Sequence, residues 1–271
     1  YTTLATDSVD PVALQAKLDA FDSENELAPK VKVSYDSGSK KWNIAVAPDY
    51  TATGSYSDLS SAITAAFGKI SGTQKQKISI ENDGELTDVI SMKSNVILDF
   101  NNHTIHTTAT KYFIDMERTS NASVRNGIIT GTPGMYIFMA TCNDIVVDNM
   151  TFTRAKGKKY GGGKGIRIQC RGSARTTQGF DYYSHGIYID NIKASYLTSD
   201  GIETYCAYDV HIGTIEATDV DGCGVLLNCS RDVEILNIIG TRCCTARSEG
   251  TAGGYAAFRC ANDVGPNRSE E

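Results

Sequence analysis

The chain has 271 residues, 41% of them hydrophobic and 21% charged, and a formal net charge of -6 at pH 7. This composition supplies enough apolar side chains for a folded core and argues against intrinsic disorder. An acidic chain is a poor partner for nucleic acid, and no apolar run is long enough to span a membrane, so we expect neither as a partner.

The first quarter of the chain predicts two helices and a small hairpin. Residues 10–21, DPVALQAKLDAF, begin with a capping Asp and a Pro and then show apolar residues at helical spacing. Residues 31–47 read as two short strands around a polar turn. Residues 57–68, SDLSSAITAAFG, predict a second amphipathic helix that starts with a capping Ser and ends at a Gly. We therefore expect an N-terminal cap region over residues 1–76.

From Lys77 onward, the helical pattern gives way to short β-rich runs with alternating aliphatic residues and a turn signal after each run. The last three runs, anchored on Ile187, Val210 and Val233, recur every 23 residues. A period of this size is typical of solenoid proteins. Because the repeats are rich in strand-forming residues, they predict an all-β domain over residues 77–271 that is built as a parallel β-helix.

A second run in each repeat ends in cysteine. Aligning IRIQC, IETYC, VLLNC and AAFRC places four cysteines in one column: Cys170, Cys206, Cys229 and Cys260. Strands on adjacent coils lie about 4.8 Å apart, a separation that a disulfide accepts. The column therefore predicts an inward ladder of cysteines that are either packed as free thiols or bridged. Three other cysteines, close in sequence around the next corner, are better disulfide candidates: Cys223, Cys243 and Cys244.

The same alignment gathers polar and charged side chains on the outer face of the coils, because alternate residues of a strand point to opposite faces. These residues are Lys164, Arg167, Asp200, Glu203, Tyr205, Asn228 and Arg259. In this alignment Arg259 shares a column with Tyr205 and Asn228. The concentration of these side chains within a few coils indicates a groove that binds a polar ligand.

A basic stretch lies in the long insertion before the last three repeats. Residues 154–175 contain eight Lys or Arg residues and no Asp or Glu, among them Lys164, Arg167 and Arg171. Two interpretations remain open: a solvated loop, or a rim that attracts an anionic polymer to an otherwise acidic protein.

Cysteine content and glycosylation sequons predict a secreted protein. The chain has eight cysteines without a C-x-x-C pair, and it begins at Tyr1, which suggests a removed signal peptide. Five N-glycosylation sequons begin at Asn102, Asn121, Asn149, Asn228 and Asn267. The alternative is that these sequons arise by chance in a chain rich in Ser, Thr and Asn.

Residues 57–265 resemble the pectate lyase-like superfamily of right-handed β-helix proteins, through the capping helix, the segment SMKSNVILDFNNHTI and the coils. Within this part, TSDGIE is similar to the Asn-Thr-Asp-Gly-x-Asp motif of polygalacturonase-type hydrolases, and VDGC is similar to their Asp-Asp-Cys motif. The resemblance implies a right-handed parallel β-helix, and it implies catalytic carboxylates at Asp200 and Asp221.

The sequence departs from the hydrolase pattern at several points. Gly222 stands where the second Asp of the Asp-Asp-Cys motif is found, and no Gly-His-Gly motif is present. AFRCAND is only partly similar to the Arg-Ile-Lys motif of these enzymes. Polysaccharide lyases of the same superfamily use Lys or Arg as the base. In some of them acidic residues hold calcium, so calcium is a possible cofactor, although the residues themselves predict no metal site.

Two reactions fit the outward residues. β-Elimination needs a base near C5 of a uronate and a group that neutralises its carboxylate. Lys164 could be that base if Arg167 and Arg171 lower its pKa, and either arginine could bind the carboxylate. Hydrolysis instead needs two carboxyl groups around the glycosidic bond, and Asp200, Glu203 and Asp221 could supply them. Glu203 beside Arg167 could also form a plain salt bridge.

Five further residues are candidates for substrate binding: Arg171, His185, Tyr205, Asn228 and Arg259. His185 and Tyr205 could donate a proton or stack on a sugar ring. The leading hypothesis is a secreted lyase that cleaves a uronate-containing polysaccharide. The alternatives are a glycoside hydrolase of polygalacturonase type and a non-catalytic glycan-binding β-helix. Nothing after Arg259 looks like the cap that a solenoid end needs, so we expect a truncated β-helix or a partner that covers this end.

Overall fold

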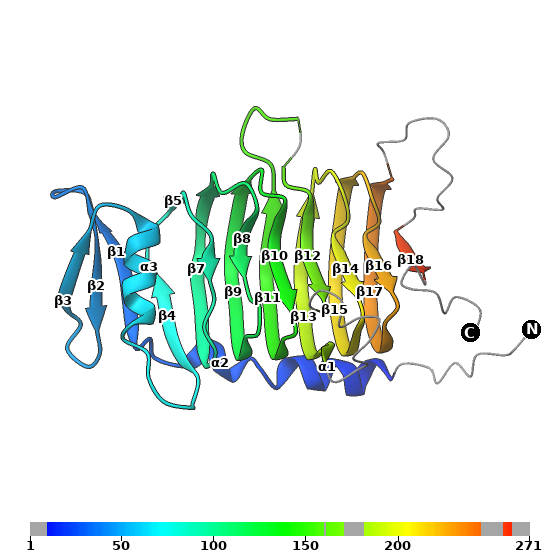
Figure 1. Ribbon diagram of the computed structural model, residues 1–271, viewed down its shortest axis with the longest axis horizontal. Helices are drawn as coiled ribbons and strands as arrows, with labels where there is room; N and C mark the ends of the chain where they lie inside the picture. The colour runs from blue at the N-terminus through cyan, green and yellow to red at the C-terminus, as the bar shows by residue number, and fades with distance from the viewer. Residues whose placement is uncertain (1–9, 160, 171–181, 245–256, 262–271) are drawn as a thin grey trace, which may run out of the picture.

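The computed structural model describes residues 10–159, 161–170, 182–244 and 257–261 (Figure 1). Its helices are α1 (Pro11–Asp19), α2 (Ser23–Glu26) and α3 (Leu59–Phe67). The rest of the regular structure is two long sheets, so the described part of the chain is mostly β with few helices. The N-terminal hairpin is antiparallel, and the remaining strand pairs are parallel.

Sheet A contains, in spatial order, β17 (Arg231–Cys243), β15 (Ala207–Val220), β13 (Ser184–Ser195), β11 (Asn143–Thr153), β9 (Ser120–Gly131), β7 (Val96–Thr107), β4 (Gln76–Ile80), β1 (Val31–Asp36), β2 (Lys41–Val46) and β3 (Thr51–Tyr56), and β5 (Gly84–Leu86) also pairs with β7. Sheet B contains β18 (Phe258–Ala261), β16 (Val225–Asn228), β14 (Ile202–Tyr205), β12 (Lys164–Gln169), β10 (Met135–Ala140), β8 (Tyr112–Asp115) and β6 (Ile90–Ser91).

Successive strands from β6 to β18 alternate between the two sheets, and each strand from β7 onward pairs in parallel with the strand two places earlier in the chain. This arrangement is consistent with a β-helix-like solenoid. The predicted period is confirmed by the register, because Ile187 pairs with Val210 and Val210 pairs with Val233. The right-handed sense of the coils stays a prediction.

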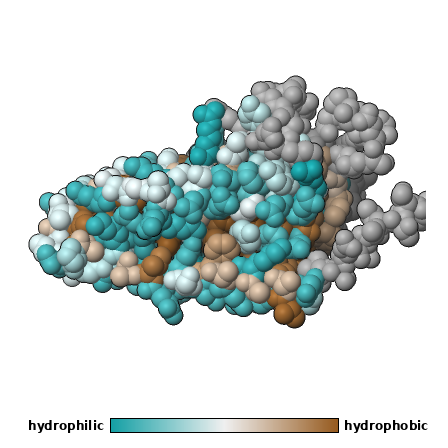
Figure 2. All heavy atoms as spheres, turned by 90° about the horizontal axis from the view of Figure 1, so that it is seen from below, coloured by the Kyte–Doolittle hydropathy of each residue, from teal (hydrophilic) through white to brown (hydrophobic). Residues whose placement is uncertain are grey.

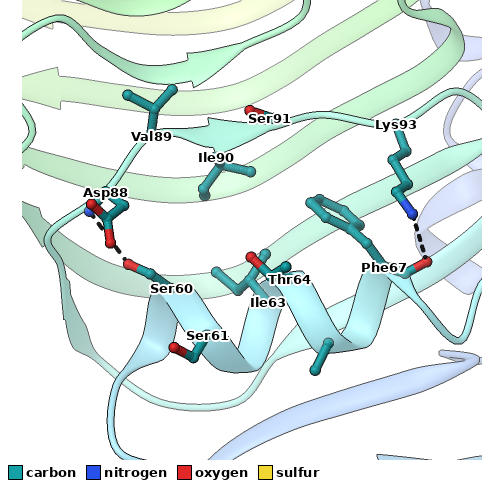
Figure 3. A pocket seen from close by; sticks show the side chains of 11 residues that line it. Ser60, Ser61, Ile63, Thr64, Phe67, Asp88, Val89, Ile90, Ser91 and Lys93 are labelled. Atoms are coloured by element: carbon teal, nitrogen blue, oxygen red, sulfur yellow. Dashed lines mark hydrogen bonds between the residues drawn. The ribbon is translucent and has the colours of Figure 1, made fainter.

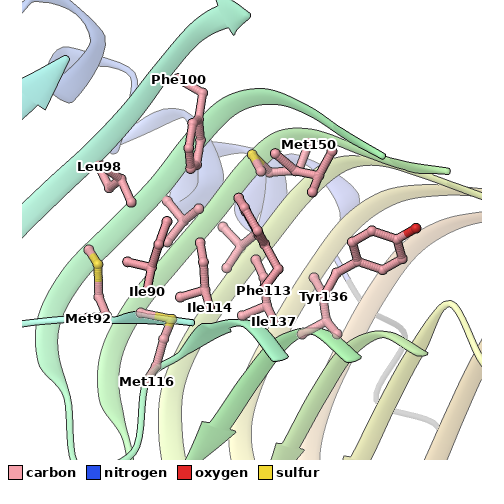
Figure 4. Close-up of a cluster of buried hydrophobic side chains, with 14 of the residues drawn as sticks. Ile90, Met92, Leu98, Phe100, Phe113, Ile114, Met116, Tyr136, Ile137 and Met150 are labelled. Atoms are coloured by element: carbon pink, nitrogen blue, oxygen red, sulfur yellow. The ribbon is translucent and has the colours of Figure 1, made fainter. Parts of the chain in front are cut away.

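One apolar core lies between the two sheets (Figure 4). Leu98 from β7, Phe113 beside Ile114 in β8, and Ile137 from β10 are all fully buried there. Tyr136 adds a polar atom, and its phenol donates a hydrogen bond of 2.6 Å to the carbonyl oxygen of Thr153. Burial raises the pKa of Tyr136, which keeps the phenol neutral inside the core.

The two predicted helices take different places. α3 lies at the N-terminal end of the solenoid, where it contacts β1, β2 and β3. α1 instead runs along the outer face of sheet A and contacts β13, β15 and β17 (Figure 1). Figure 2 views the molecule from this side and shows a mainly hydrophilic surface with small hydrophobic patches. The boundary at residue 76 stays a prediction, although β1 pairs with β4 and so continues sheet A.

A buried charge network fastens the N-terminal segment, residues 10–26, to sheet A. Arg125 of β9 is 1% exposed and donates to the backbone carbonyl of Phe21 at 2.6 Å. The same guanidinium pairs with Asp148 at 2.8 Å and with Glu24 at 3.4 Å. Glu24 also pairs with Lys75 at 2.5 Å. The segment therefore supplies both a carboxylate and a carbonyl oxygen to cations of the sheet.

Asparagines occupy the corners of several coils in the left-handed backbone conformation. Asn102, Asn126, Asn149 and Asn191 all have positive φ, which Asn tolerates better than most residues. The amide nitrogen of Asn149 donates to Asn126 Oδ1 at 2.9 Å and to Asn102 Oδ1 at 3.3 Å. These contacts explain why Asn recurs at this bend within the long strands of sheet A, and they engage the glycosylation nitrogen of the Asn149 sequon.

The cysteine column is partly as expected. The N–H of Cys170 donates to Tyr205 and that of Cys206 donates to Asn228, so Cys170, Cys206 and Cys229 are aligned. The inclusion of Cys260 was wrong, because Cys260 pairs with Leu227. In this register the backbone N–H of Ile202 donates to the carbonyl of Gly224, and that of Val225 donates to the carbonyl of Ala257. All eight cysteines lie in the described ranges, and no disulfide joins any of them, including the predicted disulfide candidates.

The core is less well covered at its C-terminal end. Three inward side chains of β17 are only partly buried: Val233, Ile235 and Ile238. Their register partners in β15, which are Val210, Ile212 and Ile215, are fully buried. With Leu227 and Phe258, the β17 side chains line a cavity of about 430 Å³. A partner or further polypeptide at this end stays a prediction.

Candidate functional site

The outer face of sheet B brings together four of the predicted residues from β12 and the β14 coil. Lys164 and Arg167 both belong to β12. Asp200 and Glu203 belong to the next coil, and Glu203 is the register partner of Arg167. Lys164 Nζ lies 2.8 Å from Asp200 Oδ2 and 2.7 Å from Glu203 Oε2. The guanidinium of Arg167 contacts the same oxygen of Glu203. We call these four residues the Lys164 cluster.

The carboxylates of the Lys164 cluster are buried. Asp200 is 2% exposed and Glu203 is 5% exposed. Removing two carboxylates from water is costly unless cations compensate, and here one lysine and one arginine balance two negative charges. The predicted salt bridge between Glu203 and Arg167 is therefore part of a larger network, in which the carboxylates hold the two cations in place.

Lys164 is held as an ammonium. Burial by itself would lower its pKa, but the ion pairs with Asp200 and Glu203 outweigh that effect and raise the pKa above the ordinary value. The condition for Lys164 to act as the base, a lowered pKa, is therefore not met in this structure. Its side chain also donates to Ser199 Oγ at 2.7 Å. A catalytic role for Lys164 has to use its positive charge.

These ion pairs predict a stability contribution that disappears at alkaline pH. Because the folded-state pKa is raised, the contribution is complete below the ordinary value of 10.5 and is lost as the pH rises through the folded value. We expect the difference in unfolding free energy between wild type and Lys164→Met to stay constant from about pH 7 to 9 and to shrink at higher pH. Urea denaturation at each pH measures it. A difference that grows with alkaline pH would contradict the ion pairing.

Asp200 is positioned by the next coil. Its Oδ1 accepts a hydrogen bond of 2.8 Å from the backbone N–H of Cys223. Gly222 lies against the same oxygen, and a Cβ at this position would overlap it. Gly222, where VDGC differs from the Asp-Asp-Cys motif that it resembles, therefore leaves room for the buried side chain of Asp200.

We expect Gly222→Ala to displace the Asp200 carboxylate and to destabilise the protein by about 1 to 3 kcal/mol, since a buried charged acceptor loses its partner. Chemical denaturation measures this change. Gly68→Ala is the matched control, because Gly68 ends α3 with a right-handed helical backbone that alanine adopts easily. Equal stability of both variants would show that Asp200 does not depend on this close approach.

The predicted binding residues are distributed over several places. Tyr205 lies beside the Lys164 cluster, and the guanidinium of Arg167 is 4.8 Å from the centroid of its ring. Asn228 pairs with Tyr205 but is buried. The predicted alignment of Arg259 with Tyr205 and Asn228 was wrong, because Arg259 pairs with Leu226. Arg259 therefore shares a register column with Arg167 and Glu203.

The remaining predicted residues lie outside the Lys164 cluster. Asp221 is at the corner before β16, where its N–H donates to the carbonyl of Leu197. His185 belongs to β13 of sheet A, and its ring stacks on Tyr208 at a centroid distance of 4.8 Å. Arg171 lies outside the described residues. The sequence did not single out Ser199 or Gln169, which contact the two cations of the cluster, although Ser199 directly precedes Asp200 in TSDGIE.

The described part of the chain offers no second centre with converging chemical groups. Among the described residues, no group of three or more His, Cys, Asp or Glu side chains could hold a metal ion. A cavity of about 590 Å³ lies between α3 and residues 88–93 (Figure 3). Its lining combines hydroxyl groups, apolar side chains and single charges at Asp88 and Lys93, without a convergent pair of acid and base.

No described helix is long and apolar enough to cross a membrane.

Comparisons with known proteins give only distant likenesses. No protein-family model and no curated protein matches the chain. A solved chain from Parabacteroides merdae, described as a "putative glycosyl hydrolase", is 14% identical with a TM-score of 0.41, over 68% of this chain and 86% of that one. The ORF18 protein of Geobacillus virus E2 is 10% identical with a TM-score of 0.25, over 74% of this chain and 56% of that one. Neither likeness is strong enough to carry an inference about function, and membership of the pectate lyase-like superfamily stays a prediction.

Proposed function

We propose that this protein is a carbohydrate-active enzyme that cleaves a uronate-containing polysaccharide by β-elimination on the outer face of sheet B. The observation that supports the proposal best is the Lys164 cluster. Its two cations are held beside Tyr205 by carboxylates that are themselves buried. Cations positioned in this way suit the recognition of a ligand carboxylate.

In the proposed reaction, Lys164 and Arg167 neutralise the carboxylate of the uronate, which makes the proton on C5 easier to remove. A base takes that proton, the electron pair forms the C4–C5 double bond, and the C4–O bond breaks with its electrons on the leaving oxygen. That oxygen then receives a proton, so no water is consumed. Tyr205, whose ring centroid lies 4.8 Å from the guanidinium carbon of Arg167, is our candidate for the proton transfers. Asp200 and Glu203 are positioning residues.

Hydrolysis by Asp200 and Glu203 fits the geometry less well. Both carboxylates contact the same ammonium nitrogen, so the contacting oxygens can be no more than about 5.5 Å apart, with that nitrogen between them. The glycosidic bond has to lie between the acid and the base of a hydrolase.

Product analysis tests the proposal. The protein is incubated with polymers of galacturonate, glucuronate and mannuronate, and with neutral glycans as controls. Both the ultraviolet absorbance of unsaturated sugars and the new reducing ends are measured. We expect both signals to rise together on a polyuronate. New reducing ends without absorbance would mean hydrolysis, and binding without either signal would mean a glycan-binding protein.

Secretion is part of the proposal and is supported by the sequence alone. The acceptor Asn228 is buried in the folded protein, and the amide of Asn121 donates to Asn95 Oδ1 at 2.7 Å. The amide nitrogen of Asn149 is also hydrogen-bonded, to Asn126 and Asn102. Fewer sequon asparagines are therefore available for glycosylation than the sequence suggests. Calcium binding likewise stays a prediction that the described residues do not support.

A further inference from the structure

An aromatic pair beside a lysine lies on the outer side of sheet B, in coils that precede the Lys164 cluster. The rings of Tyr112 and Phe138 stack with centroids 4.4 Å apart and planes 5° apart. The ammonium of Lys111 lies 4.7 Å from the centroid of the Tyr112 ring. Phe138 is buried, Tyr112 is half-buried and Lys111 is exposed. Phe138 therefore supports Tyr112, and Tyr112 and Lys111 reach the surface.

The register places this group in line with the Lys164 cluster. Met135 pairs with Tyr112 on one side and with Lys164 on the other. Phe138 pairs with Arg167. Because adjacent strands are about 4.8 Å apart, Tyr112 lies two coils, or roughly 10 Å, from Lys164 along the solenoid. Cations and aromatic rings thus follow one another along this face, in the order Lys111, Tyr112, Phe138, Arg167 and Tyr205.

Lys111 differs from the cations of the cluster in its partners. Lys164 and Arg167 are paired with carboxylates of the protein. No ion pair of Lys111 is found within the described ranges, and its recorded contact is with the Tyr112 ring. An ammonium without a carboxylate partner can bind the carboxylate of a ligand without first breaking a salt bridge.

We propose that Lys111 and Tyr112 form a second binding subsite for an acidic sugar residue of the polymer. The inference rests on the proposed function and deepens it. Tyr112 covers an apolar face of the sugar ring, since an aromatic side chain offers a large rigid apolar surface. Lys111 pairs with the sugar carboxylate. The polymer then runs along the solenoid axis, from Lys111 to the Lys164 cluster.

Affinity electrophoresis tests the subsite independently of cleavage. Native gels contain a polyuronate, and parallel gels contain a neutral glycan. We expect wild type to be retarded only by the polyuronate, and we expect Lys111→Ala and Tyr112→Ala to bind about tenfold more weakly, which corresponds to about 1.4 kcal/mol. Tyr112→Phe keeps the stacking and should bind as wild type does. Lys193→Ala, which removes an exposed lysine of sheet A, should have no effect.

Kinetics give the second readout. On a long polyuronate, Lys111→Ala should raise KM with little change in kcat, whereas short oligomers that reach only the Lys164 cluster should be cleaved as by wild type. Retardation that depends on Lys111 and Tyr112, but without cleavage, would support the subsite and refute the lyase. An unretarded wild type, or retardation that both alanine variants retain, would overturn the subsite. Thermal unfolding of each variant controls for folding.

Discussion

Arg167→Ala is expected to lower kcat/KM on a polyuronate by about 100- to 1,000-fold, the usual effect of removing one preorganised charge from a reacting centre. Arg167 lies on the outer face of β12 between Glu203 and the ring of Tyr205. Its loss removes a cation that is proposed to face the uronate carboxylate. Among the described residues, it leaves Lys164 as the one cation paired with the two buried carboxylates. Initial rates over a range of polymer concentrations measure the effect.

Arg231→Ala is the matched control. Its guanidinium also lies over a tyrosine, 5.2 Å from the Tyr208 centroid, but it belongs to sheet A. We expect nearly unchanged rates for this variant. Arg167→Lys should retain part of the activity, because the charge remains while the planar guanidinium is lost. If Arg167→Ala and Arg231→Ala had equal activity, Arg167 would have no part in the reaction.

Arg125→Ala is expected to produce the largest loss of stability, about 3 to 5 kcal/mol, because it takes the paired cation from Asp148 and one of the two paired cations from the buried Glu24. Glu24 and Asp148 both pair with this guanidinium, and the carbonyl of Phe21 loses its donor. The N-terminal segment should then detach from sheet A and become sensitive to protease. Urea denaturation, followed by the fluorescence of the single tryptophan, Trp42, measures the stability.

Lys193→Ala again serves as the comparison, since the exposed pair of Lys193 and Glu216 contributes at most about 1 kcal/mol. A loss below about 1 kcal/mol for Arg125→Ala would show that the N-terminal segment binds sheet A through α1 alone. Restored stability in Arg125→Lys would show that charge, and not the forked geometry of arginine, holds the segment.

Periodicity predicted most of the fold. The helical spacing of residues 10–21 and 57–68 appears as α1 and α3, although Asp58 and not Ser57 caps α3. The alternating runs appear as the strands of sheets A and B. β3 was missed because TATGSY has no aliphatic alternation. The position of α1 was also missed, because its apolar face shows that the helix packs, but not against which surface.

The convergence of the site residues could be predicted from the sequence wherever it depends only on the register of adjacent strands. Lys164, Asp200 and Glu203 converge because equal positions in adjacent coils lie one strand spacing apart. The protonation of Lys164 could not be predicted, since the pKa depends on side-chain orientation and burial. Arg259 was misplaced because the alignment followed cysteine, whereas the strand pairing places Cys260 beside Leu227 and Arg259 beside Leu226.

One measurement tests the central claim directly: mass spectrometry of oligosaccharide products formed from a defined polyuronate in heavy-oxygen water. Elimination consumes no water. We therefore predict product pairs whose masses add up to that of the substrate, with one unsaturated sugar and no heavy oxygen from the cleavage step. Products that together weigh one water more than the substrate and carry heavy oxygen at the new reducing end would contradict the account and identify a hydrolase.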